Sequence, residues 1–189
     1  MNIFYLDKDP VIAAQMHCDK HVVKMILETA QLLCTAHRVL DGEEYIELSK
    51  ANRRLKRWKL SDEKKENVFY KATHVNHPSA IWVRDNAAAY TWTYNLFAAL
   101  CDEYTYRYGK VHLTDQKLRE LLDSYPWRIY NGVVVLEPPQ CMPAEYQVTC
   151  DTVQAYQNYY IFEKAHMCVW TKRAVPDFMV STMGGTAVL

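Results

Sequence analysis

Residues 18–40 read CDKHVVKMILETAQLLCTAHRVL, and this stretch decides the fold because its apolar residues cover most of a helical circumference. That pattern is typical of a buried helix. Asp9 and Pro10 form a helix-start pair upstream, and Gly42 is a helix stop downstream. We therefore expect one continuous helix of about thirty residues between them, and a mostly helical core around it.

The polar residues of this helix fall on one narrow stripe. His17, His21, Lys24 and Glu28 occur at i, i+4, i+7 and i+11, which confines them to about 60° of arc. A polar stripe on a buried helix lines a cleft, binds a ligand or is satisfied by other buried polar groups. Two imidazoles, an amine and a carboxylate suit proton transfer or anion binding. A polar seam packed against other polar side chains is the alternative.

Length and composition indicate one ordinary domain. The chain has 189 residues, of which 50% are hydrophobic and 13% aromatic, so a full core needs neither disulfides nor metal. We find no apolar run long enough to cross a bilayer and no signal-type N-terminus. The six cysteines are widely spaced and include no CxxC pair. We expect a cytoplasmic protein with reduced cysteines and no membrane partner.

The rest of the chain predicts more helices and one irregular segment. Further helices, each begun by a proline or a capping residue, are expected within 43–70 and over 78–108, 114–122 and 151–170. Prolines make residues 125–149 irregular, with a strand-like run only at 133–136. The predicted fold is a mostly α, single-domain helical bundle over residues 1–180. A flexible C-terminal tail is expected at 181–189.

Positive charge is concentrated in one segment, although the net charge is zero. Residues 50–65 read KANRRLKRWKLSDEKK, with eight basic residues, two acidic ones and a tryptophan. Basic side chains around an aromatic ring grip phosphates and stack on a base, so duplex DNA is a candidate partner. The residues assigned to this contact are Arg53, Arg54, Lys56, Arg57 and Trp58. A solvated helical face is the alternative.

More anion-binding candidates lie where the second long helix begins. His74 and His77 precede Pro78, and unpaired backbone N–H groups at a helix start attract anions. His77 is equally well placed to cap that helix. Arg84, two turns further along, is expected to pair with an acid or a ligand phosphate.

Metal binding is a further alternative for the histidines. The spacing of His17 and His21 would allow chelation on one helical face, with Glu28, His74 or His77 completing the set. No HExxH sequence or paired acidic motif accompanies them. We therefore expect no metal and no other cofactor.

The segment CDKHVVKMILE at 18–28 resembles the first helix of the phage pyrimidine-dimer DNA glycosylases, the endonuclease V family. In that family a D-x-H sequence is followed, seven residues after the histidine, by the catalytic glutamate. Here Asp19 and His21 are followed by Glu28 at the same offset. The helix start after Asn76 and the aromatic run YQNYY at 156–160 are similar to that family in arrangement.

The resemblance implies a DNA glycosylase with AP-lyase activity on damaged or modified pyrimidines, acting in the host cytoplasm if a phage encodes it. An amine attacks C1′ and forms a Schiff base, and a glutamate supports ring opening and elimination. Glu28 would be that carboxylate, and His21 would hold a phosphate or orient Glu28. The amine would be the α-amine of Met1, which the bulky Asn2 would retain, or that of Lys24. An α-amine suits the role because its ordinary pKa is about 8.

A second function from a different class stays open. Duplex-DNA binders are generally basic overall, whereas this chain is neutral. The alternative is a helical pocket protein that binds, sequesters or cleaves a free nucleotide or a nucleotide-derived signal. Phages carry such counter-defence proteins as well as repair enzymes. A nucleotide-like small molecule would then be the partner in place of DNA.

Overall fold

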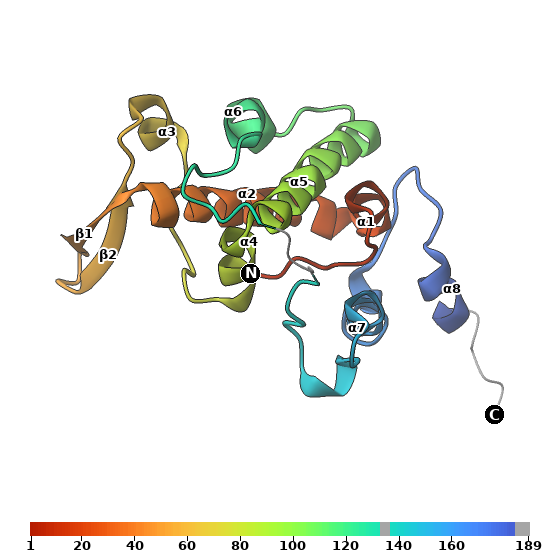
Figure 1. The fold of residues 1–189 in the computed structure, drawn as a ribbon. Helices are drawn as coiled ribbons and strands as arrows, with labels where there is room; N and C mark the ends of the chain where they lie inside the picture. The colour runs from red at the N-terminus through yellow and green to blue at the C-terminus, as the bar shows by residue number, and fades with distance from the viewer. Residues whose placement is uncertain (133–136, 184–189) are drawn as a thin grey trace.

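The computed structural model describes residues 1–132 and 137–183, with side chains described up to 180. Most of these residues are helical, and they contain a single two-stranded sheet (Figure 1). The prediction of a mostly α single-domain bundle is confirmed. Among the described residues, no helix is both long and apolar enough to cross a membrane. The strand-like run at 133–136 and residues 184–189 of the expected tail lie outside the described residues.

The first long helix is broken, which differs from the prediction. α1 (Pro10–Met16) begins as expected at Asp9, whose carboxylate accepts hydrogen bonds from the first turn. The backbone is then extended at His17 and Cys18, with ψ of 133° and 162°. α2 (Asp19–Asp41) starts after this break and ends before Gly42.

Tertiary hydrogen bonds explain the break. The backbone N–H of Asp19 donates to Val169 O at 2.8 Å, so it does not donate to the preceding helical turn. The Arg107 guanidinium donates to Gln15 O at 3.0 Å and to His17 O at 2.9 Å. These backbone groups find distant partners, and the helix stops where they do.

Residues 43–59 form a β-hairpin, so the helices expected within 43–70 are wrong over most of that range. β1 (Glu43–Leu48) pairs antiparallel with β2 (Arg54–Lys59), and α3 (Glu63–Val68) follows with Asp62 as its N-cap. Burial along β2 alternates with period two near its start, where Leu55 and Arg57 are half-buried and Arg54 and Lys56 are exposed. A charge-rich strand of this kind lacks the apolar stripe that a packed helix needs.

Arg38 ties the hairpin and α3 to the end of α2. Its side chain is 3% exposed and donates to four backbone carbonyls and one carboxylate. The acceptors are Trp58 O, Glu66 O, Phe69 O, Tyr70 O and Glu66 Oε2. The strands also pass so close to α2 that a Cβ at position 42 would collide with Arg38 O and Trp58 Cβ. Glycine is required there by this close approach.

The second long helix is broken in the same way as the first. α4 (Pro78–Asp85) and α5 (Ala87–Tyr108) are separated by Asn86, whose backbone is extended and whose side chain caps α5 through Ala89 N at 2.9 Å. α5 ends as predicted at Gly109, which adopts the left-handed region with φ of 66°. α6 (Leu113–Leu122) is capped by His112, two positions before the expected cap at position 114.

The C-terminal part begins with the predicted cap and then departs from regular helix. α7 (Thr152–Tyr159) is capped by Asp151 and continues into a π-helical turn (Tyr160–Lys164) and a short 3₁₀ turn (Ala165–Met167). α8 (Asp177–Met183) follows, so residues 181–183 of the expected tail are helical. A one-turn 3₁₀ helix (Ala144–Tyr146) lies within the irregular proline-rich segment.

α2 is the central element of the bundle. It packs against α5, α4 and α6, and α5 also packs against α1. Figure 1 shows α5 crossing α2, with the hairpin at one end of α2 and α7 and α8 beyond the other. The amino-terminal residues Ile3–Leu6 are buried beside this core. The first turns of α2 are therefore enclosed by the chain's amino terminus and its last third.

The first prediction concerns Arg38. Arg38→Met should lower the free energy of unfolding by about 3 kcal/mol, because it leaves buried carbonyls and Glu66 without their partner. Urea unfolding of the purified variant measures this. Arg53→Met is the matched control, since Arg53 is exposed and surface changes stay within about 0.5 kcal/mol. Equal losses in the two variants would contradict the role given to Arg38.

Candidate functional site

A cavity of about 600 Å³ opens beside the first turns of α2. Its walls come from the amino-terminal segment, α2, the start of α4, the proline-rich segment and the turns after α7. The lining residues are Met1, Asn2, Phe4, Lys20, His21, Lys24, Glu28, His77, Cys141, Tyr159, Lys164, His166 and Met167. Five residues singled out from the sequence are thus brought together, namely Met1, His21, Lys24, Glu28 and His77.

Glu28 joins the amino-terminal segment to α2. Its Oε1 lies 3.3 Å from Lys24 Nζ, one turn earlier on the helix, and its Oε2 accepts a hydrogen bond from Asn2 N at 3.4 Å. The Glu28 side chain is 17% exposed and that of Lys24 is 59% exposed. A carboxylate is therefore held between a lysine and the first peptide group of the chain.

The amino-terminal segment is fixed by its own side chains. Asn2 Nδ2 donates to Cys141 O at 2.9 Å, and Asn2 Oδ1 accepts from Ile3 N at 2.8 Å. Phe4 has φ of 51°, in the left-handed region, which costs about 1–3 kcal/mol for a residue with a side chain. Its ring centroid lies 4.4 Å from that of His21. Packing and hydrogen bonds thus hold Met1 at the cavity wall.

His21 is a neutral imidazole in the cavity wall. Its Nδ1 lies 2.5 Å from Tyr160 OH, and this hydroxyl also accepts from Cys18 N at 3.2 Å. Burial, together with the charges of His17, Lys24 and Lys164, lowers the pKa of His21 to about 3. The Tyr160 hydroxyl has one proton and two acceptors within reach, His21 Nδ1 and Cys18 Sγ. When it donates to Nδ1, the ring proton of His21 is on Nε2 and can bind a phosphate or sugar oxygen.

Lysine side chains line the cavity with His21. Lys20 and Lys24 come from α2, while Lys164 comes from the turns that follow α7, as does the imidazole of His166. Lys164 Nζ lies 4.6 Å from the ring centroid of Tyr159, close enough for a cation–π contact. The cavity therefore favours an anionic ligand, with an aromatic ring in its wall.

His77 caps α4 and also lies in the cavity wall. It lines the cavity, and its Nδ1 accepts a hydrogen bond from Ser79 N at 3.2 Å as the cap of α4. Burial lowers its pKa most, and the charges of the amino terminus and His74 act in the same direction, whereas Glu28 opposes them. The cap fixes the orientation of the imidazole in the cavity wall.

Three predicted binding residues lie outside the lining. His17 is fully buried behind the cavity, where Nδ1 contacts Ala13 O at 2.6 Å and Nε2 has no hydrogen-bond partner among the described residues. His74 is exposed and contacts its neighbour Thr73. Arg84 donates to two backbone carbonyls, Val75 O and Ala80 O, so the expected acidic partner is wrong. His17 leaves the stripe because the helix breaks there.

Metal ligation finds no geometric support within 1–132 and 137–183. No group of three or more His, Cys, Asp or Glu side chains converges there as a metal site would require. The ring centroids of His17 and His21 are 6.3 Å apart, at an interplanar angle of 62°.

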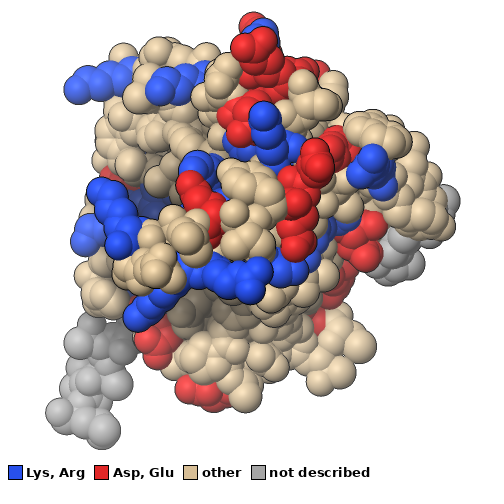
Figure 2. Space-filling model, turned by 90° about the vertical axis from the view of Figure 1, so that its left-hand side faces the viewer, with Lys and Arg blue, Asp and Glu red and all other residues tan. Residues whose placement is uncertain are grey.

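The hairpin lies at the other end of α2 from the cavity. About 20 Å of helix separates Glu28 from Asp41, at 1.5 Å per residue. Lys56 pairs with Glu44 at 2.9 Å and Arg57 with Glu47 at 2.7 Å, which neutralises part of the basic stretch. Basic and acidic side chains are interspersed on this face (Figure 2). The five proposed DNA-contact residues therefore form a surface apart from the cavity.

Several lining residues were not identified from the sequence as part of this site. Lys20 stands beside His21 in the motif, so proximity along the helix could have found it. Phe4, Cys141 and His166 carry no such signal, because they come from segments far apart in the chain.

The cavity brings together side chains of several chemical types. Lysine amines, a carboxylate and a neutral imidazole line it. No protein-family model, no curated protein and no solved structure matches this chain.

The second prediction concerns acid stability. Burial lowers the pKa of His17 to about 4 and that of His21 to about 3, whereas an unfolded histidine titrates near about 6.5. Below that value the unfolded chain binds more protons, so stability falls as the pH drops, by about 1.4 kcal/mol per pH unit for each histidine. Urea unfolding between pH 7 and pH 5 measures the slope.

Substitutions of single histidines show how much each one contributes to the pH dependence of the unfolding free energy. His21→Gln should reduce the slope by about 1.4 kcal/mol per pH unit, because one histidine with a lowered pKa is removed. His74→Gln is the control, since His74 is exposed and its replacement should leave the slope unchanged. An unchanged slope in His21→Gln would show that His21 is protonated in the folded protein.

Proposed function

We propose that this chain is a DNA glycosylase with AP-lyase activity on damaged or modified pyrimidines. The observation that carries the proposal is that Glu28 lies beside the Lys24 amine and the peptide N–H of Asn2, in a cavity that Met1 also lines. An amine that forms a Schiff base and a carboxylate that assists it must share a site. The resemblance of residues 18–28 to the endonuclease V family supports the same chemistry.

The α-amine of Met1 is the favoured nucleophile. Met1 lines the cavity, and the next backbone nitrogen, Asn2 N, lies 3.4 Å from Glu28 Oε2. α-Amines as a class lose their proton more readily than lysine amines. Lys24 is the second candidate, but it is 59% exposed and paired with Glu28, unlike the desolvated lysines that act as nucleophiles.

The proposed reaction assigns a role to each part of the cavity. The amine attacks C1′ of the damaged nucleotide, the glycosidic bond breaks, and the base leaves with the bonding electrons. Loss of the amine proton leaves an aminal at C1′. Glu28 then assists protonation of O4′, so the C1′–O4′ bond breaks, the sugar ring opens and the protonated Schiff base forms. Removal of a 2′ proton then breaks the C3′–O bond and nicks the strand. His21 Nε2–H would bind a sugar or phosphate oxygen, and Lys20 and Lys164 would bind phosphates.

Charge pairing on the hairpin favours the second candidate function. The ion pairs of Lys56 and Arg57 with glutamates reduce the charge available for a duplex. A cavity of about 600 Å³ is also within the size range of small-molecule sites. A pocket protein that binds, sequesters or cleaves a free nucleotide-like molecule is therefore the alternative.

The third prediction tests for the amine directly. Borohydride added during incubation with abasic-site DNA should trap a covalent protein–DNA adduct, because it reduces the Schiff base to a stable amine. Peptide mapping should place the adduct on Met1, and intact-mass measurement checks that its α-amine is free. An adduct on Lys24 would move the nucleophile to α2.

Undamaged duplex DNA is the control for trapping and should give no adduct. A protein that forms no adduct with abasic-site or lesion DNA, yet binds a mononucleotide tightly, would overturn the glycosylase proposal. That result would establish the pocket-protein alternative.

The fourth prediction concerns Glu28. Glu28→Gln keeps the shape of the side chain but removes its charge, so strand cleavage should fall by about 10²–10⁴-fold, the range for loss of an acid–base group. The melting temperature should stay within a few degrees of that of the unmodified protein, because the Glu28 ion pair is partly exposed.

Glu120→Gln is the matched control for Glu28→Gln. Glu120 is exposed on α6, away from the cavity, and its replacement should leave cleavage unchanged. A Glu28→Gln variant that unfolds would show that this carboxylate is a structural partner. A folded variant with full cleavage activity would remove Glu28 from the mechanism.

A further inference from the structure

Two segments far apart in the chain lie side by side at the start of α2. Asp19 N donates to Val169 O at 2.8 Å, and Trp170 Nε1 donates to Met16 O at 2.9 Å. The Thr171 hydroxyl donates to Asp19 Oδ2 at 2.7 Å. These bonds hold residues 16–19 against residues 168–171.

Cys18 and Cys168 face each other within this pairing. Each cysteine directly precedes one member of the hydrogen-bonded pair formed by Asp19 and Val169. The Cys18 and Cys168 side chains interact with each other, and the Cys168 thiol also donates to Lys164 O at 3.1 Å. Both thiols are reduced in this structure. Two interacting thiols on adjoining backbone segments are candidates for a disulfide.

We propose that Cys18 and Cys168 are a redox-active pair that a hydroperoxide converts into a disulfide. This inference is independent of the proposed glycosylase function, because it rests only on the contact between the two segments.

The surroundings of the two sulfurs differ in a way that suits this reaction. The interaction with the Cys168 side chain lowers the pKa of Cys18, as do backbone N–H groups at the start of α2, although burial opposes them. The same interaction, with burial, raises the pKa of Cys168, which keeps the proton. Cys18 is fully buried, whereas Cys168 is half-buried and gives a small oxidant access.

The atoms balance with one hydroperoxide per pair. A thiolate sulfur attacks the peroxide O–O bond, takes one oxygen to become a sulfenic acid, and the other oxygen leaves as water after protonation. The second sulfur attacks the sulfenic sulfur and expels its oxygen as a second water. Two thiols and hydrogen peroxide thus give one disulfide and two water molecules.

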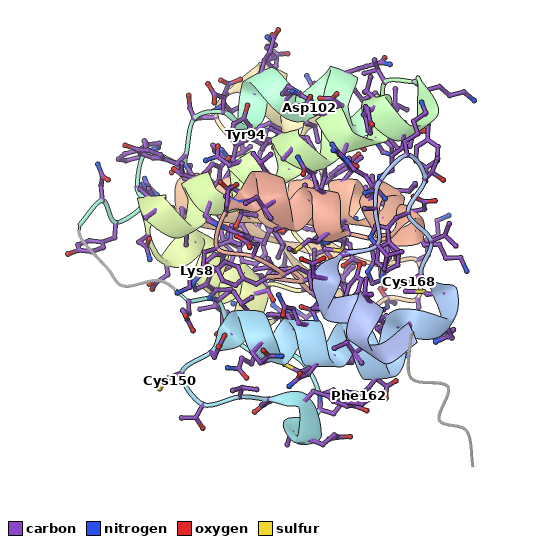
Figure 3. All side chains as sticks on the ribbon, turned by 90° about the vertical axis from the view of Figure 1, so that its right-hand side faces the viewer. Lys8, Tyr94, Asp102, Cys150, Phe162 and Cys168 are labelled. Atoms are coloured by element: carbon purple, nitrogen blue, oxygen red, sulfur yellow. The ribbon has the colours of Figure 1, made fainter. Side chains whose placement is uncertain are left out.

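Three other cysteines lack this combination. Burial raises the pKa of Cys34 to about 12 and also raises that of Cys101, so both are poor nucleophiles. Cys150 is exposed, and Figure 3 shows it beyond the end of α7 opposite to the end near Cys168. Cys150 is therefore the matched control, because its oxidation would reflect exposure to solvent alone.

The pair also contacts the cavity through Tyr160. The Tyr160 hydroxyl lies 2.5 Å from His21 Nδ1 and 3.7 Å from Cys18 Sγ, so the two atoms compete for one proton. A disulfide sulfur is a weaker acceptor than a thiolate. Oxidation would therefore leave His21 as the acceptor and fix the ring proton of His21 on Nε2.

The fifth prediction uses hydrogen peroxide as the probe. The reduced full-length protein is treated with peroxide, its remaining thiols are alkylated, and it is digested without reductant for mass spectrometry. A peptide that joins Cys18 to Cys168 should be the main cross-linked product. Cys150→Ser should form it in the same yield, and Cys168→Ser should not form it.

Two outcomes would overturn the proposal. One is oxidation of Cys150 while Cys18 and Cys168 stay reduced, and the other is a cross-link that joins different cysteines. If Cys168→Ser fails to fold, as judged by circular dichroism, the cross-link map of the unmodified protein and of Cys150→Ser decides the question alone.

Discussion

The buried guanidinium of Arg107 is the interaction on which the rest of this structure depends. Its side chain is fully buried on α5 and donates to Gln15 O, His17 O, Asp19 Oδ1 and Glu103 Oε1. A charge removed from water must be paired and hydrogen-bonded, because its desolvation is otherwise very costly. Here two carboxylates and two backbone carbonyls meet that need.

This requirement shapes the start of α2. The carbonyls that Arg107 binds belong to the end of α1, and its carboxylate partner Asp19 opens α2. The Asp19 carboxylate in turn accepts hydrogen bonds from the backbone N–H and the hydroxyl of Thr171, which hold the C-terminal segment beside the start of α2. Burial by itself raises the pKa of Glu103. Hydrogen bonds from Arg173 and Arg107 outweigh this effect and hold the pKa below its ordinary value, so the Glu103 carboxylate stays ionised.

The candidate site follows from this arrangement. Because α2 begins afresh at Asp19, His21 lies in its first turn beside Tyr160 and Phe4, and Glu28 lies two turns further along. The aspartate of the D-x-H motif has a structural role here, whereas its histidine and the later glutamate line the cavity. One buried arginine therefore connects the helix break, the cavity wall and the pairing of Cys18 with Cys168.

The sequence by itself determined what depends on local chemistry and helical periodicity. It predicted the helical class, the caps at Asp9, His77 and Asp151, and the stop at Gly109, because capping and left-handed backbone are set by neighbouring residues. It also grouped His21, Lys24 and Glu28, since residues three, four and seven apart share a helical face.

Only the tertiary structure decided where helices break and which segments meet. The breaks at His17 and Asn86 arise from distant hydrogen bonds, to Arg107 and Val169 in one case and to Tyr130 O in the other. The hairpin at 43–59 is held against α2 by Arg38, which binds one backbone carbonyl in β2 and three more after the hairpin. Lys164, His166 and Cys141 reach the cavity through packing of the last third of the chain, which no local pattern specifies, because contacts between remote residues depend on the whole fold.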